Sequence, residues 1–142
     1  MRKILFFALT TSVFWSSVSC AHNGPEAGAR SYAQNYKDMV LATCITDAYA
    51  SDKSAAMDAG SSVSALIDWT IYDLDKSPNA VDSLVKRYLA RNYYNPLVES
   101  EIKGVKFDLL KCLDMYHSKE LDALTKQIVI DPDHTYRQDH KK

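Results

Sequence analysis

The chain has 142 residues, a length that suits one domain with a single hydrophobic core. Its 17 basic and 18 acidic side chains give a formal net charge of −1. Nucleic-acid binding is therefore disfavoured, because neutralising phosphates requires a basic surface and no stretch of the chain concentrates lysine and arginine.

Residues 1–20 have the pattern of a secretory signal peptide, with Arg2 and Lys3 followed by an apolar run and then small residues. Two cleavage sites fit. Cleavage before Cys20, in the lipobox-like SVSC of 17–20, would leave Cys20 as a lipidated first residue, whereas cleavage after Ala21 would release an unattached protein. Either site delivers the chain outside the cytoplasm. The expected location is the periplasm, with membrane attachment only if Cys20 is lipidated.

After a leader at residues 21–30 that we expect to be flexible, the chain is predicted to be helical to about residue 130. Apolar residues recur at the helical period, capping residues mark the starts, and no convincing two-residue alternation indicates a strand. The predicted helices are 32–49, 52–60, 61–75, 77–92, 97–117 and 118–130. Asp131-Pro132 should end the last helix, leaving 131–142 as a loose polar tail. The predicted fold class is all-α, one domain at 31–130 with five or six helices.

The stretch 61–75 carries apolar residues on two opposite faces of its predicted helix. One face has core spacing and comprises Val63, Leu66, Ile67, Thr70, Ile71 and Leu74. The opposite face comprises Ala65, Asp68, Trp69 and Tyr72. Such a helix is either central and buried all round, or it presents the Trp69 and Tyr72 face to a partner, since these residue types are enriched where binding energy concentrates. Spacing leaves both interpretations open.

The three cysteines are Cys20, at the processing site, and the pair Cys44 and Cys112. In a secreted protein an even pair predicts a disulfide, which here would join the first and fifth predicted helices. The alternative is two buried free thiols. A zinc site is disfavoured because no CxxC pair or histidine cluster accompanies the cysteines.

No catalytic constellation emerges from the sequence. His117 is best explained by its place at a helix C-terminus, and the other histidines, His22, His134 and His140, lie in the terminal segments. Cys44 could be written as a hydrolase nucleophile only if it were free of a disulfide. There is no phosphate-binding glycine loop or HExxH motif. The sequence therefore favours a binding protein that is not an enzyme and needs no cofactor or metal.

Several stretches resemble the immunity proteins that neutralise type VI secretion amidase effectors of the fourth amidase family. They are 36–45 (YKDMVLATCI), 58–66 (DAGSSVSAL), 69–70 (WT), 95–100 (NPLVES), 111–114 (KCLD) and 116–121 (YHSKEL). The resemblance extends from about Ser31 to Tyr136. It implies a periplasmic, all-helical homodimer that protects against self or sister-cell intoxication. Its partner would be a cysteine peptidase that cuts peptidoglycan between D-glutamate and diaminopimelate.

The resemblance further implies that a protruding segment of the inhibitor enters the amidase groove and blocks the active site. By position this segment maps to about Gly60–Asp73. The predicted partner contacts are Gly60, Ser61, Ser62, Ser64, Asp68, Trp69, Tyr72 and Asp73. Residues 60–62 (GSS) would form a flexible or protruding start to it. The alternative is a periplasmic helical adaptor or chaperone without an amidase target, whose mark would be a broad apolar groove.

Overall fold

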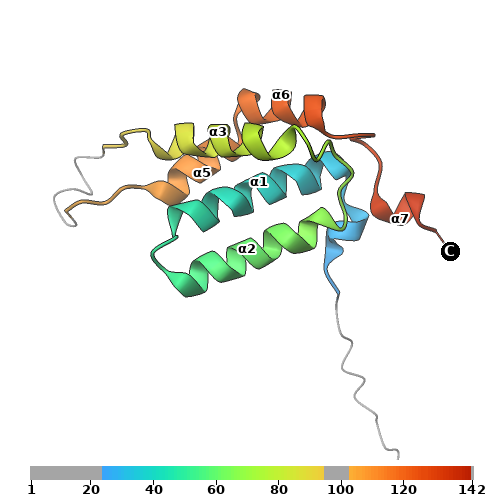
Figure 1. Cartoon of the computed structure of the whole chain (residues 1–142), viewed down its shortest axis with the longest axis horizontal. Coiled ribbons are helices and arrows are strands. Elements are labelled where there is room, and N and C mark those ends of the chain that lie inside the picture. The colour runs from blue at the N-terminus through green and yellow to red at the C-terminus, as the bar shows by residue number, and fades with distance from the viewer. Residues whose placement is uncertain (1–23, 95–102, 142) are drawn as a thin grey trace, which may run out of the picture.

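The computed structural model describes residues 24–94 and 103–141 (Figure 1). Within these residues the elements are a short 3₁₀ helix and six α-helices, with no strand, so the predicted all-α class is confirmed. They are η1 (Glu26–Ala29), α1 (Tyr32–Ala48), α2 (Lys53–Ile67), α3 (Ser77–Leu89), α5 (Asp108–Tyr116), α6 (Lys119–Ile128) and α7 (Tyr136–Asp139). The predicted signal peptide, Cys20 and the 95–100 stretch lie outside the described residues. No helix of the described part is long and apolar enough to cross a membrane.

Helix α1 lies at the centre of the fold, between α2 on one side and α3 and α5 on the other (Figure 1). Its inward residues recur every four positions, as predicted, and Tyr32, Tyr36, Val40 and Cys44 are fully buried. Val81, Leu84, Val85 and Tyr88 of α3 and Leu121 and Ile128 of α6 complete the core. These stripes follow the predicted helical period, which is why α1, α3 and α6 were placed correctly from sequence.

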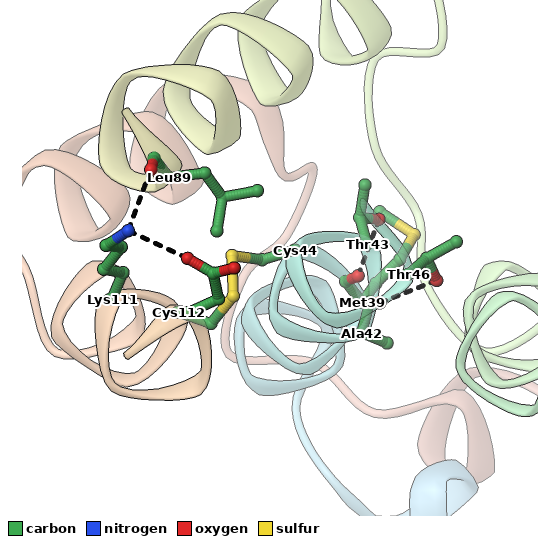
Figure 2. The surroundings of a disulfide bond; sticks show 9 residues. Met39, Ala42, Thr43, Cys44, Thr46, Leu89, Lys111 and Cys112 are labelled. Carbon is green, nitrogen blue, oxygen red and sulfur yellow. Dashed lines mark hydrogen bonds and ion pairs between the residues drawn. A yellow bond between two sulfur atoms is a disulfide. The ribbon is translucent and has the colours of Figure 1, made fainter. Parts of the chain in front are cut away.

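The disulfide between Cys44 and Cys112 is present, with an S–S distance of 2.04 Å and a Cα–Cα distance of 5.7 Å. It joins the buried faces of α1 and α5 (Figure 2). Next to it the buried Lys111 donates to the carbonyl of Leu89 at 3.1 Å and pairs with Asp108 at 2.8 Å. One side chain of α5 thus holds the C-terminal end of α3, while the neighbouring cysteine ties α5 to α1.

Helix α2 differs from the prediction, because it does not stop at Gly60. Asp52 caps it as predicted, accepting hydrogen bonds from Ser54 and Ala55. The helix then continues through Gly60 to Ile67. Gly60 lies against Thr46 of α1, whose side chain would be 3.9 Å from an added Cβ. The glycine therefore sits at a helix–helix contact and not at a left-handed stop.

Within residues 103–117, the part of the predicted helix 97–117 that the structure describes, the helix begins at Asp108. Gly104 has φ +76° and Phe107 has φ +55°, and both values are incompatible with a continuous right-handed helix. The predicted stripe holds at Cys112, which is buried, but Leu109 is exposed. Ser118 caps α6 as predicted, with its hydroxyl accepting from the Leu121 N–H at 3.1 Å.

The two ends of the described chain pack together, which differs from the flexible leader and loose tail expected there. The first N–H groups of α1 lack intrahelical partners, and two of them donate to the tail: Tyr32 to His134 at 2.8 Å and Ala33 to Pro132 at 2.9 Å. The buried Tyr32 hydroxyl donates to Asp139 of α7 at 2.8 Å. Burial raises the pKa of Tyr32 to about 12. Helix α7 in turn contacts η1.

Candidate functional site

Residues 60–73, the predicted partner-binding segment, form the last two turns of α2 and the start of the connector to α3. Ser61, Ser62, Ser64 and Asp68 are all exposed, so solvent and a partner can reach them. The three serine hydroxyls donate back to the main-chain carbonyls four residues earlier, at 2.8–3.3 Å. The GSS stretch is therefore part of a regular helix, which differs from the flexible start that was one of the two expectations for this segment.

Trp69 and Tyr72 lie against the core rather than on an open face. The Trp69 carbonyl accepts a hydrogen bond from the buried Asn35 side chain at 2.9 Å, and its indole lies beside Gly28 of η1. The Tyr72 ring packs on Tyr36 with the ring centroids 5.4 Å apart. Burial raises the pKa of Tyr72. Both rings are half-buried, so each combines a packing role with an edge open to a partner.

Only some residues of the predicted core stripe at 61–75 are buried in the structure. Val63 and Leu66 pack as predicted, and the buried Thr70 donates to the Leu66 carbonyl at 2.7 Å. Ile67, Ile71 and Leu74 are exposed, so the prediction is wrong for them. For Ile71 and Leu74 the cause is that the helix ends at Ile67, and beyond it the chain no longer turns by 100° per residue. The connector instead directs its aromatic side chains inward.

Asp73 fixes the connector where it turns into α3. Its carboxylate accepts hydrogen bonds from the main-chain N–H groups of Asp75 and Lys76 at 3.1 Å and pairs with the Lys76 ammonium at 2.7 Å. Lys76 holds the pKa of this carboxyl below its usual value. Asp73 was predicted as a partner contact, and its observed bonds give it a role in the local structure as well.

Asn35 links η1, α1 and the connector after α2, and sequence reasoning missed it. Its side-chain amide donates to the carbonyls of Ala27 and Trp69, both at 2.9 Å, and its oxygen accepts from Arg30 at 3.2 Å. The residue is fully buried in α1. A buried asparagine must be hydrogen-bonded. A polar residue on the inward stripe of the first helix was therefore a signal that could have been followed.

Two surface grooves lie near exposed apolar residues. One, of about 320 Å³, is lined by Met39, Val63, Ile67, Tyr72 and Val81, with Asp47 and Asp82 among its polar residues. The other, of about 310 Å³, is lined by Tyr93, Tyr94, Phe107 and Leu110. Beside the second groove, Leu109 and Leu113 of α5 and Tyr49 are also exposed. The sequence had assigned Leu109 to the core and had not identified this apolar surface.

The residues considered for catalysis are not brought together. Cys44 is disulfide-bonded and fully buried, so it has no thiolate to act as a nucleophile in this state. His117 caps the C-terminus of α5, as its position predicted. In the described ranges no three His, Cys, Asp or Glu side chains are grouped so as to hold a metal ion.

The family model described as type VI secretion system (T6SS) amidase immunity protein matches residues 34–125. The chain belongs to this family. The match spans α1, α2, α3 and α5 and most of α6, and it includes both bridged cysteines. The resemblance inferred from the sequence is thereby confirmed. An amidase immunity protein implies a cognate secreted toxin as its partner.

The immunity protein is also similar to a solved structure from a study of type VI-secreted toxins and self-resistance proteins in Serratia marcescens. The two chains are 25% identical, with a TM-score of 0.72, and the alignment covers 94% of this chain and 98% of the other. Nearly the whole immunity protein therefore shares the fold of that chain. No curated protein sequence matches the chain.

Proposed function

We propose that this immunity protein acts in the periplasm by binding a type VI-secreted peptidoglycan amidase and occluding its active site. The target is a cysteine peptidase that cuts the stem peptide between D-glutamate and diaminopimelate. Protection is stoichiometric and requires no turnover, so cells are spared when the effector is delivered by a neighbouring or sister cell. The observation that carries this proposal is the family match over residues 34–125.

Two features support a site of action outside the cytoplasm. Residues 1–20 have the composition of a secretory signal peptide. The Cys44–Cys112 bridge joins two fully buried cysteines, and disulfides of this structural kind persist in oxidising compartments. Lipidation of Cys20 would add a membrane anchor, and mass spectrometry of the mature N-terminus distinguishes the two forms.

The exposed face of the second half of α2 supports binding by a preformed surface. Ser61, Ser64 and Asp68 lie on a regular helix that packs along α1, so little conformational freedom is lost when a partner binds them. Gly60 and Ser62 share this helix, while Trp69 and Tyr72 offer only their outer edges. We therefore assign the first contacts with the amidase to the α2 hydroxyls and the Asp68 carboxylate.

The test is a peptidoglycan hydrolysis assay with the mature protein and a purified amidase of this class. Hydrolysis should fall linearly with added inhibitor and reach zero at one inhibitor chain per active site. Light scattering on the same samples reports whether two copies of the immunity protein associate, as the expected homodimer requires. Full hydrolysis at equimolar inhibitor, repeated with other amidases of this class, would remove the proposal.

A further inference from the structure

A cluster of exposed aliphatic side chains lies where the connector after α2 meets the segment after α6. The two segments run side by side at one end of the helical layers (Figure 1). Tyr72 and Val129 form an antiparallel bridge, and the Ile130 N–H donates to the Ile71 carbonyl at 3.0 Å. Opposite residues of an antiparallel pair point to the same side. Tyr72 and Val129 therefore point into the core, and the neighbouring pair Ile71 and Ile130 points to solvent.

The exposure of these side chains is large for aliphatic residues. Ile71 is 40% exposed, Ile130 is 50% exposed, and Leu74, which follows on the same connector, is 66% exposed. We call the surface formed by Ile71, Leu74 and Ile130 the connector face. Grouped exposed apolar side chains with a polar surround are typical of interaction sites. The bridge and the Asp73 hydrogen bonds hold this face in one conformation.

The two segments that carry the connector face are strongly acidic. Residues 68–76 and 129–135 together hold five aspartates and one lysine, although the whole chain is nearly neutral. Lys76 is engaged by Asp73. Within residues 24–94 and 103–141 no basic side chain pairs with the four remaining carboxylates, which are Asp68, Asp75, Asp131 and Asp133. His134, exposed near the end of the second segment, pairs with Asp139 of α7.

We propose that the connector face is a second docking surface for the amidase, against an apolar patch that is rimmed by lysine or arginine. This inference rests on the proposed function and extends the contact from α2 to residues 129–133. The negative charge around the connector face favours a partner with a basic surface. A second copy of this chain would bring carboxylates against carboxylates, which is unfavourable, whereas a basic rim is attracted and its association is steered. The aliphatic centre then supplies the desolvated contact.

Binding of the mature protein to the amidase that it inhibits, measured by surface plasmon resonance, tests the docking surface. Leu74→Ser and Ile130→Ser should each raise Kd by about tenfold or more, as expected for a central apolar contact. Asp75→Lys should lower the association rate, and the loss should shrink as salt is raised. Unchanged melting temperatures will show that these exposed positions do not alter the fold.

Matched controls lie at the far end of the molecule. Leu109 is 46% exposed at the start of α5, and Asp47 is exposed in the last turn of α1. Asp47 is about 22 Å along α1 from Tyr32, whose N–H bonds to His134. Leu109→Ser and Asp47→Lys should bind the amidase as the wild type does. Equal weakening by controls and connector-face variants would contradict a localised docking surface.

The outcomes separate the two proposals. Tight binding by the wild type together with unchanged binding by Leu74→Ser, Ile130→Ser and Asp75→Lys would overturn the connector face and leave the proposed function standing. Failure of the wild type to bind any amidase of the class would remove both. If Leu74→Ser instead converts a homodimer to monomers in sedimentation velocity, the connector face is a contact between copies and the docking proposal is wrong.

Discussion

Removing the disulfide should destabilise the fold more than any other change of similar size. The bridge closes a loop spanning 68 residues, and the chain-entropy model assigns such a loop about 4 kcal/mol of stability at 25 °C. Replacing both cysteines by alanine also removes two fully buried sulfur atoms, which adds about 1 kcal/mol for each site. Because small domains are stable by about 5–15 kcal/mol, the double variant should lose a large part of its stability.

The assay is equilibrium unfolding in urea of three forms: oxidised wild type, wild type with reductant, and Cys44→Ala/Cys112→Ala. Reduced wild type keeps the sulfur atoms, so its difference from the oxidised form isolates the bridge. We expect a loss of about 4 kcal/mol on reduction and a further, smaller loss in the double variant. A loss below about 1 kcal/mol on reduction, or two titratable thiols in the unfolded but unreduced protein, would refute the reasoning.

Three further predictions concern positions where the structure changed the interpretation. Gly60→Ala should stabilise the protein by about 0.5–1 kcal/mol in thermal unfolding, because Gly60 is helical and a Cβ has room beside Thr46. The variant should also inhibit as the wild type does, and lost inhibition would restore a flexible role for this glycine. Asn35→Ala should cost about 2–3 kcal/mol in urea unfolding, because the Ala27 and Trp69 carbonyls lose their shared donor; a neutral effect would remove its linking role. Burial raises the pKa of Tyr32 from about 10 to about 12, so its contribution to stability is complete below pH 10 and is lost as pH rises toward 12. Tyr32→Phe should therefore make the free energy of unfolding fall less steeply with pH in this range, in alkaline unfolding followed by tyrosinate absorbance. An unchanged pH dependence of stability would contradict this prediction.

The helices α1, α3 and α6 were predictable because their sequence signals are local. Each carries a core stripe at the helical period, and the serine before α6 provides a capping hydroxyl. The disulfide followed from the parity of the cysteines together with the secretory leader. In these cases, neighbouring residues in the sequence determine the conformation, and tertiary packing agrees with them.

The end of α2 was not predictable because distant residues determine it. The connector pairs with a segment more than 50 residues later: the Ile71 carbonyl accepts from Ile130, and the Asp73 N–H donates to Ile128. Asn35 also binds the Trp69 carbonyl. These contacts satisfy backbone groups that a longer helix would have bonded internally. The helical projection of 61–75 therefore failed beyond Ile67, where Ile71 and Leu74 are exposed and Tyr72 packs on Tyr36.

The chain ends were misjudged for a similar reason. Residues 132–139 are polar and read as a loose tail, but the Pro132 and His134 carbonyls accept the first N–H groups of α1. The polar composition of a segment indicates how little apolar surface it can bury. It does not indicate whether the main-chain carbonyls of the segment will accept hydrogen bonds from unpaired N–H groups elsewhere in the fold. The candidate site likewise depends on the family resemblance for its location, while the structure supplies which of its side chains are exposed.

The most direct test of occlusion is protection of the amidase nucleophile. The active-site cysteine of the inhibited amidase should react rapidly with iodoacetamide when the enzyme is alone, and mass spectrometry counts the alkylated fraction. With equimolar immunity protein, whose own Cys44 and Cys112 are bridged and buried, the nucleophile should remain unmodified while denatured complex reacts fully. Alkylation at the free-enzyme rate in a complex that no longer cuts peptidoglycan would show that inhibition does not proceed by covering the active site.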